Sequence, residues 1–154
     1  ELYAMRIVTR LLALSRSIQL NRQFRDIQRE IDSMPLATRR QLASLAVKEF
    51  TNASQCEYPH LYGTPGEQHG STETWGKGVE VGYTRVRSEN PHIKLRGIAL
   101  WLTVAYFETK DSEYGEAQNL HKQLMRTLRV LKEYAPPLTA QDRWSAEIGR
   151  AAVA

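Results

Sequence analysis

Apolar residues recur every three or four positions through the first 34 residues, with no Pro or Gly among them. The set comprises Ile7, Leu11, Leu14, Ile18, Leu20, Phe24, Ile27, Ile31 and Met34. Such spacing predicts one apolar stripe along a helix over residues 3–32. At 1.5 Å per residue this helix is about 45 Å long, longer than a compact domain of this size is wide. One end should therefore project or pack against a second copy of the chain.

The same segment carries the excess charge of the protein. Residues 1–40 hold eight arginines and four acidic residues, which accounts for the whole net charge of +4. No acidic residue occurs between Leu2 and Arg25. The candidate binding residues are Arg22, Arg25, Arg29, Arg39 and Arg40.

The first three of these arginines are spaced by three and four and form a ridge on one helix face. Arg39 and Arg40 join that ridge if the following helix folds back. A basic ridge neutralises the phosphates of a nucleic acid, and it also suits a protein partner or an anionic membrane surface. Asp26 and Glu30 interrupt the ridge and reduce its charge.

Pro35 ends the first helix and begins a second, expected over residues 35–52. Its buried residues are predicted to be Leu36, Leu42, Leu45, Ala46 and Phe50. Residues 53–78 are rich in Gly, Pro, Ser, Thr, Gln and His without apolar periodicity, which predicts a long irregular loop.

Residues 79–87 fit two structures. Val79, Val81 and Tyr83 alternate as in a strand, whereas Val79, Tyr83 and Val86 have helical spacing. Nearby glycines favour a strand, which would pair with residues 92–107 in a hairpin. We favour a helix here, and a second one over 92–107 that is apolar on nearly every face and starts at Asn90-Pro91.

Two further helices complete the expected fold. One covers residues 117–135 and ends at a pair of prolines, and a short one is expected over residues 139–152. The prediction is a single all-α domain, residues 1–154, of four to six helices, with an α+β fold containing the 79–107 hairpin as the alternative. The longest apolar run has ten residues, fewer than the roughly 18 that a bilayer span requires.

The loop contains the residues best suited to a metal. Cys56, His60 and His69 would bind zinc, although their spacing matches none of the usual zinc motifs. Cys56 is the only cysteine, so the chain has no internal disulfide. A single thiol fits both a cytosolic protein and a secreted protein without a disulfide, and of the two we expect a cytoplasmic protein. No catalytic set is evident, and His121 is expected to lie at the edge of the core.

These observations favour a non-enzymatic helical interaction or regulatory protein without a cofactor. We expect it to form a homodimer through the long first helix and to bind a protein partner. The first alternative is a helical module that binds nucleic acid through the arginines. A third hypothesis is a metalloprotein or enzyme that uses residues 56–73.

Overall fold

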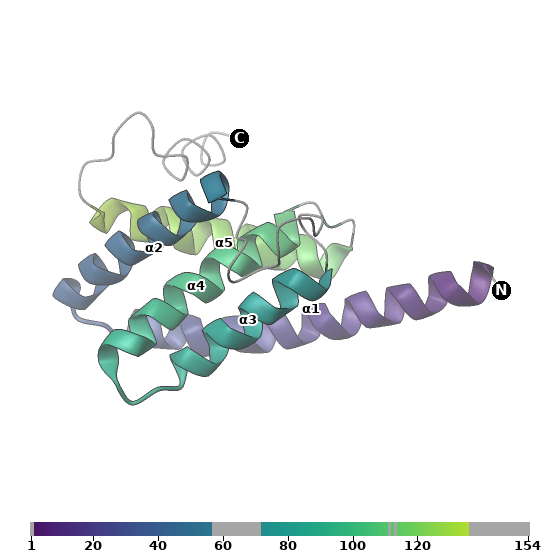
Figure 1. Ribbon diagram of the computed structural model, residues 1–154, viewed down its shortest axis with the longest axis horizontal. Coiled ribbons are helices and arrows are strands. Elements are labelled where there is room, and N and C mark those ends of the chain that lie inside the picture. The colour runs from purple at the N-terminus through teal and green to yellow at the C-terminus, as the bar shows by residue number, and fades with distance from the viewer. Residues whose placement is uncertain (1, 57–71, 111, 113, 136–154) are drawn as a thin grey trace.

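The computed structural model describes residues 2–56, 72–110, 112 and 114–135, and these residues form five helices (Figure 1). In chain order the helices are α1 (Leu2–Asp32), α2 (Leu36–Cys56), α3 (Thr72–Val86), α4 (Pro91–Lys110) and α5 (Gly115–Tyr134). No strand occurs in the described residues, so the all-α prediction is confirmed and the hairpin alternative is wrong.

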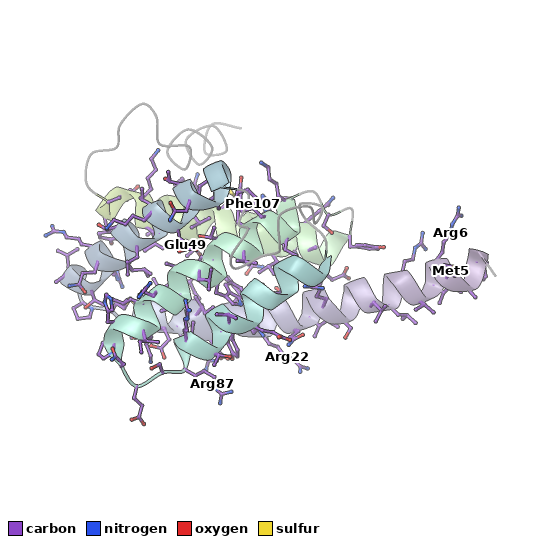
Figure 2. The ribbon with its side chains drawn as sticks, viewed as in Figure 1. Met5, Arg6, Arg22, Glu49, Arg87 and Phe107 are labelled. Atoms are coloured by element: carbon purple, nitrogen blue, oxygen red, sulfur yellow. The ribbon has the colours of Figure 1, made fainter. Side chains whose placement is uncertain are left out.

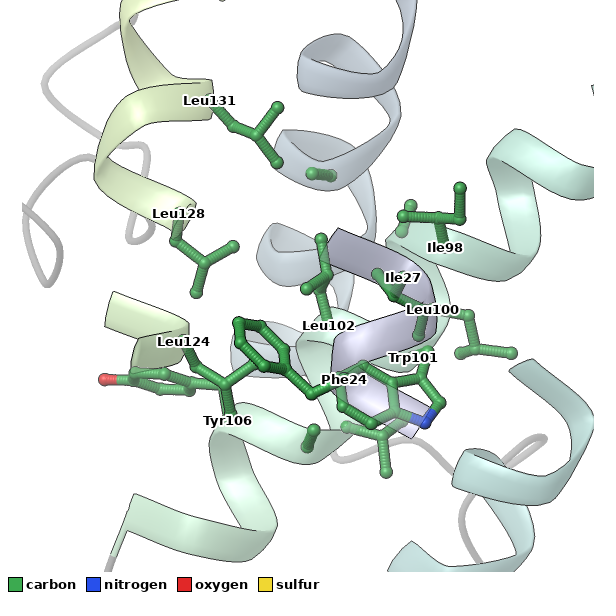
Figure 3. Close-up of a cluster of buried hydrophobic side chains, with 14 of the residues drawn as sticks. Phe24, Ile27, Ile98, Leu100, Trp101, Leu102, Tyr106, Leu124, Leu128 and Leu131 are labelled. Atoms are coloured by element: carbon green, nitrogen blue, oxygen red, sulfur yellow. The ribbon is translucent and has the colours of Figure 1, made fainter. Parts of the chain in front are cut away.

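Helix α4 lies at the centre of the fold and contacts all four other helices. Twelve of its 20 residues are buried, from Leu95 to Thr109. Trp101 and Leu102 are fully buried and point into the core with residues of α1 and α5 (Figure 3). The prediction that this helix is apolar on nearly every face is confirmed from Leu95 to Tyr106, where every residue except Arg96 is buried.

Two glycines allow α3 and α4 to approach closely. A Cβ atom added to Gly82 would lie 2.9 Å from the backbone nitrogen of Trp101, and one added to Gly97 would lie 2.5 Å from the Cβ of Arg85. Glycine therefore serves here to bring two helix backbones together. This packing outweighs the poor helix propensity of glycine, and residues 79–86 are helical.

The ends of the helices follow the capping signals only in part. Asn90 caps α4 as expected, since its side-chain oxygen accepts a hydrogen bond from the backbone N–H of His92 at 3.0 Å. The predicted boundaries of the loop over residues 53–78 are wrong at both ends, because α2 continues to Cys56 and α3 begins at Thr72. Residues 57–71 and the helix expected over 139–152 lie outside the described residues.

The second half of α1 is tied to three other helices by polar contacts. The indole N–H of Trp101 on α4 donates to Gln23 at 2.8 Å, and this contact is buried. Thr127 on α5 donates to Gln28 at 2.8 Å. On α3, the hydroxyl of Tyr83 donates to Asp26 at 2.6 Å, and this hydrogen bond lowers the pKa of the Asp26 carboxyl.

Replacement of Gly97 by Ala tests the close approach of α3 and α4. The new methyl group would lie 2.7 Å from the backbone nitrogen of Val86, so the helices must separate. We expect G97A to lower the free energy of unfolding by about 2–3 kcal/mol, as overpacking does in other cores. Urea unfolding followed by circular dichroism measures this change.

Gly115→Ala is the matched control, because a Cβ at this helical position meets nothing within 4 Å. Gly115 is the first residue of α5, where helix propensity counts for less than in the interior, so this variant should gain at most about 0.5–1 kcal/mol. Equal stability of G97A and wild type would contradict the close approach.

Candidate interaction surface on the first helix

The first half of α1 projects beyond the other helices (Figures 1 and 2). Its large apolar side chains are exposed rather than buried. They are Tyr3, Met5, Ile7, Val8, Leu11, Leu12, Leu14 and Ile18. Exposed apolar side chains in this number along one segment are typical of interaction surfaces. The expectation that one end of the long helix projects is confirmed.

The apolar residues of α1 form two stripes instead of the single stripe predicted. We name Ile7, Leu11, Leu14 and Ile18 the N-terminal stripe, and Leu20, Phe24, Ile27 and Ile31 the core stripe. The N-terminal stripe is exposed, with Leu11 at 60% of its full accessibility, whereas the core stripe is at most 5% exposed.

The change of face follows from the spacing at the junction of the stripes. Ile18 and Leu20 are two residues apart, which turns a helix by about 200°. The mean directions of the two stripes differ by about 140° around the helix axis. The core stripe faces the other helices, so the N-terminal stripe faces away from them. This signal was present in the sequence, where spacings of three and four are interrupted once by a spacing of two.

An ion pair between Arg16 of α1 and Glu108 of α4 marks the point where α1 leaves the other helices. The side chain of Glu108 is only 11% exposed. Burial raises the pKa of its carboxyl, and the positive charge of Arg16 opposes that rise. The ion pair joins α1 to α4 at the base of the projecting half.

The five predicted binding arginines are not gathered into one ridge. Arg22, Arg25 and Arg29 lie exposed on the side of α1 that carries the N-terminal stripe. Arg29 is paired with Asp26. Arg39 instead donates to the backbone oxygen of Asp32 at 3.0 Å, and its guanidinium lies 5.9 Å from the ring centre of Tyr134 on α5.

The structure gives Arg39 a structural contact, which sequence spacing could not show. Its donation to a carbonyl in the last turn of α1 satisfies one of the groups that a helix end leaves unpaired. Arg40 lies exposed on α2. The binding role predicted for these arginines stays a prediction, and it would depend on the exposed side chains of Arg22, Arg25 and Arg40.

The predicted metal ligands are not described by the structure. Cys56 is the last residue of α2, without a described side chain, and His60 and His69 lie outside the described residues. Elsewhere, in the part of the chain that is described, no group of three or more His, Cys, Asp or Glu residues could hold a metal ion. The zinc hypothesis stays a prediction.

Two other candidate sites lie within the helical body. His121 lies at the edge of the core, where its ring is 5.0 Å from that of Tyr106 and its Nδ1 is 2.9 Å from the hydroxyl of Thr109. A groove of about 380 Å³ runs between α1 and α5, with Phe24, Arg39 and Tyr134 among its lining residues.

Comparison of the chain with protein-family models, with curated proteins and with solved structures gave no match. Among the described helices, none combines the length and the apolar character that crossing a membrane requires.

Replacement of Arg16 by Met tests the ion pair with Glu108 while retaining most of the aliphatic stem. The variant leaves a buried carboxylate without its counter-ion, so we expect a loss of roughly 2–3 kcal/mol in the free energy of unfolding at pH 7. Because burial favours protonated Glu108, the loss should shrink as the pH falls through the raised pKa of this carboxyl. Urea titrations at pH 7 and pH 4 measure both effects.

The double variant Arg16→Met with Glu108→Gln is the control. It removes both charges, so its stability at pH 7 should return most of the way to that of wild type. A loss in R16M that is the same at both pH values would show that the ion pair is not its cause.

Proposed function

We propose that the protein is a non-enzymatic helical interaction module that self-associates through the N-terminal stripe of α1. The observation that carries this proposal is the exposure of four large aliphatic side chains on a helix face turned away from its own core. Covering such a surface removes apolar area from water and contributes about 25 cal/mol for each Å² buried.

The spacing of the stripe favours a helix as its occupant. Ile7, Leu11, Leu14 and Ile18 are separated by four, three and four residues, which is the spacing of the a and d positions of a coiled coil. Side chains at these positions interlock with those of a facing helix. A second copy of α1 supplies a stripe of the same length and composition.

An anionic membrane surface is the competing occupant, because a basic amphipathic helix can lie in a lipid interface. Of the three arginines in the projecting half, Arg16 is already paired with Glu108. Arg6 and Arg10 remain, and each contributes only about 1 kcal/mol at a negatively charged membrane. Arg22 and Arg25 are exposed on the same face and would add to this gain, so the preference for a second copy of the chain rests on the coiled-coil spacing of the stripe.

Charged substitutions within the stripe test self-association. We expect the double variant Leu11→Glu with Leu14→Glu to raise the dissociation constant of the dimer at least about 100-fold, because burial of unpaired charges costs several kcal/mol. The variant should still fold, since both side chains are exposed in the single chain. Sedimentation velocity over a range of protein concentrations measures the dimer, and circular dichroism checks the fold.

Met5→Glu with Leu12→Glu is the matched control. These residues are 68% and 67% exposed on the same half of α1 but lie outside the stripe, so the control should remain dimeric. Monomeric wild-type protein at every concentration would overturn the proposal. Co-sedimentation with vesicles of phosphatidylcholine and phosphatidylserine that both double variants abolish would assign the surface to membranes instead.

Nucleic-acid binding is the second candidate function, and the exposed side chains of Arg22 and Arg25 support it. Against it, Arg29 is paired with Asp26 and Arg39 is engaged by Asp32 and Tyr134. If the arginines bind phosphates, affinity for duplex DNA or RNA should fall linearly with salt on logarithmic axes. The variant Arg22→Gln with Arg25→Gln should lower by about two the steepness of the plot of log affinity against log salt concentration. Absence of binding at low salt would eliminate this candidate.

A further inference from the structure

The N-terminal stripe has the same pattern in both chain directions. Its residues are Ile, Leu, Leu and Ile, and their spacings are four, three and four. From this symmetry we infer that two copies pair their α1 helices antiparallel about a two-fold axis near Leu12 and Ala13. The inference rests on the proposed self-association and specifies the arrangement of the two chains.

Antiparallel pairing places like residues together across the interface. Ile7 packs on Ile18 of the partner subunit, and Leu11 packs on Leu14 of the partner subunit. The two-fold axis repeats both contacts, which gives four layers of aliphatic side chains. This is the self-complementary interface that two-fold symmetry requires, in which one patch meets its own copy.

The residues that follow the stripe set the register. The next positions in the same a and d pattern are Asn21 and Arg25, both polar. A shift by one heptad in either direction loses at least one aliphatic layer, and one of the two shifts sets Ile7 against Arg25 of the partner subunit. Polar residues at a and d positions select one register among several in this way.

A parallel arrangement of the two α1 helices would be less stable because of the same two positions. It would place Asn21 on Asn21 of the partner subunit and Arg25 on Arg25 of the partner subunit. Two guanidinium groups brought together repel each other, whereas the antiparallel arrangement keeps them at opposite ends of the interface. The antiparallel arrangement also opposes the two helix dipoles.

The fold leaves room for the partner helix. The helical body covers the core stripe of α1, and its flanking contacts are Asp26 with α3 and Gln28 with α5. The N-terminal stripe lies between these flanks on the outer side of the helix. A second α1 can therefore run along the stripe while the two bodies lie on opposite outer sides of the helix pair.

Distances between spin labels distinguish the arrangements. Single cysteines at Met5, Leu12 or Gln19, in a Cys56→Ser background, carry the label. These three positions are seven residues apart, lie on one face outside the stripe and are exposed. An antiparallel pair offsets the two labels along the helix axis by about 2 Å at position 12, and by about 20 Å at positions 5 and 19.

The expected result is a short distance between the two labels when they are at position 12. At positions 5 and 19 the distance between the labels should be longer, by several ångströms to about 10 Å. Equal distances at all three positions would indicate a parallel pair and overturn this inference while self-association stands. The absence of any distance between subunits, together with monomeric protein in sedimentation, would overturn the proposed function itself. Retention of the dimer by each cysteine variant is checked first.

Discussion

The burial of Trp101 against the second half of α1 is the contact on which the arrangement of the chain depends. The indole is fully buried, its ring centre lies 6.2 Å from that of Phe24, and its N–H donates to Gln23. A buried indole N–H without an acceptor would cost free energy, so the hydrogen bond ties the rotation of α1 to the position of α4. Once that rotation is set, the core stripe faces inward and the N-terminal stripe must face outward.

The projecting half of α1 follows from this constraint and from the length of the helix. The helical body reaches along α1 as far as Arg16, which pairs with Glu108 near the C-terminal end of α4. Beyond that point no other described helix covers α1, and its apolar side chains meet solvent (Figure 1). A helix with a buried stripe on one face and an exposed stripe on another can pack into the core of its own chain and bind a second helix at the same time.

The charges of α1 are divided between structure and surface in the same way. Asp26, Glu30 and Gln28 are directed to Tyr83, Lys94 and Thr127 on three different helices. Arg22 and Arg25 remain exposed just beyond the N-terminal stripe. In the antiparallel pair that we infer, these arginines lie at both ends of the aliphatic interface. Their charge limits the length of the interface and the register of the two helices.

Local patterns determined most of the helices. Apolar residues at mostly helical spacing, with no Pro or Gly, specify α1, the Asn90-Pro91 pair starts α4, and two prolines follow α5. The strand alternative for residues 79–87 was wrong because packing outweighs helix propensity at Gly82 in α3. The prediction itself failed at Leu36, which was expected to be buried but begins α2 and is 51% exposed. Arg39 was assigned to a basic surface, but Asp32 and Tyr134 hold it within the fold.

The sequence by itself determined that the first helix is long and basic, and the spacing of its apolar residues, which we interpreted as a single stripe, sets two directions around the helix axis. It did not determine which face is buried, since both stripes consist of large aliphatic or aromatic residues. Only the tertiary structure decided this, through a hydrogen bond between residues 78 positions apart, Gln23 and Trp101. Burial depends on which distant side chains meet, and no local pattern contains that information.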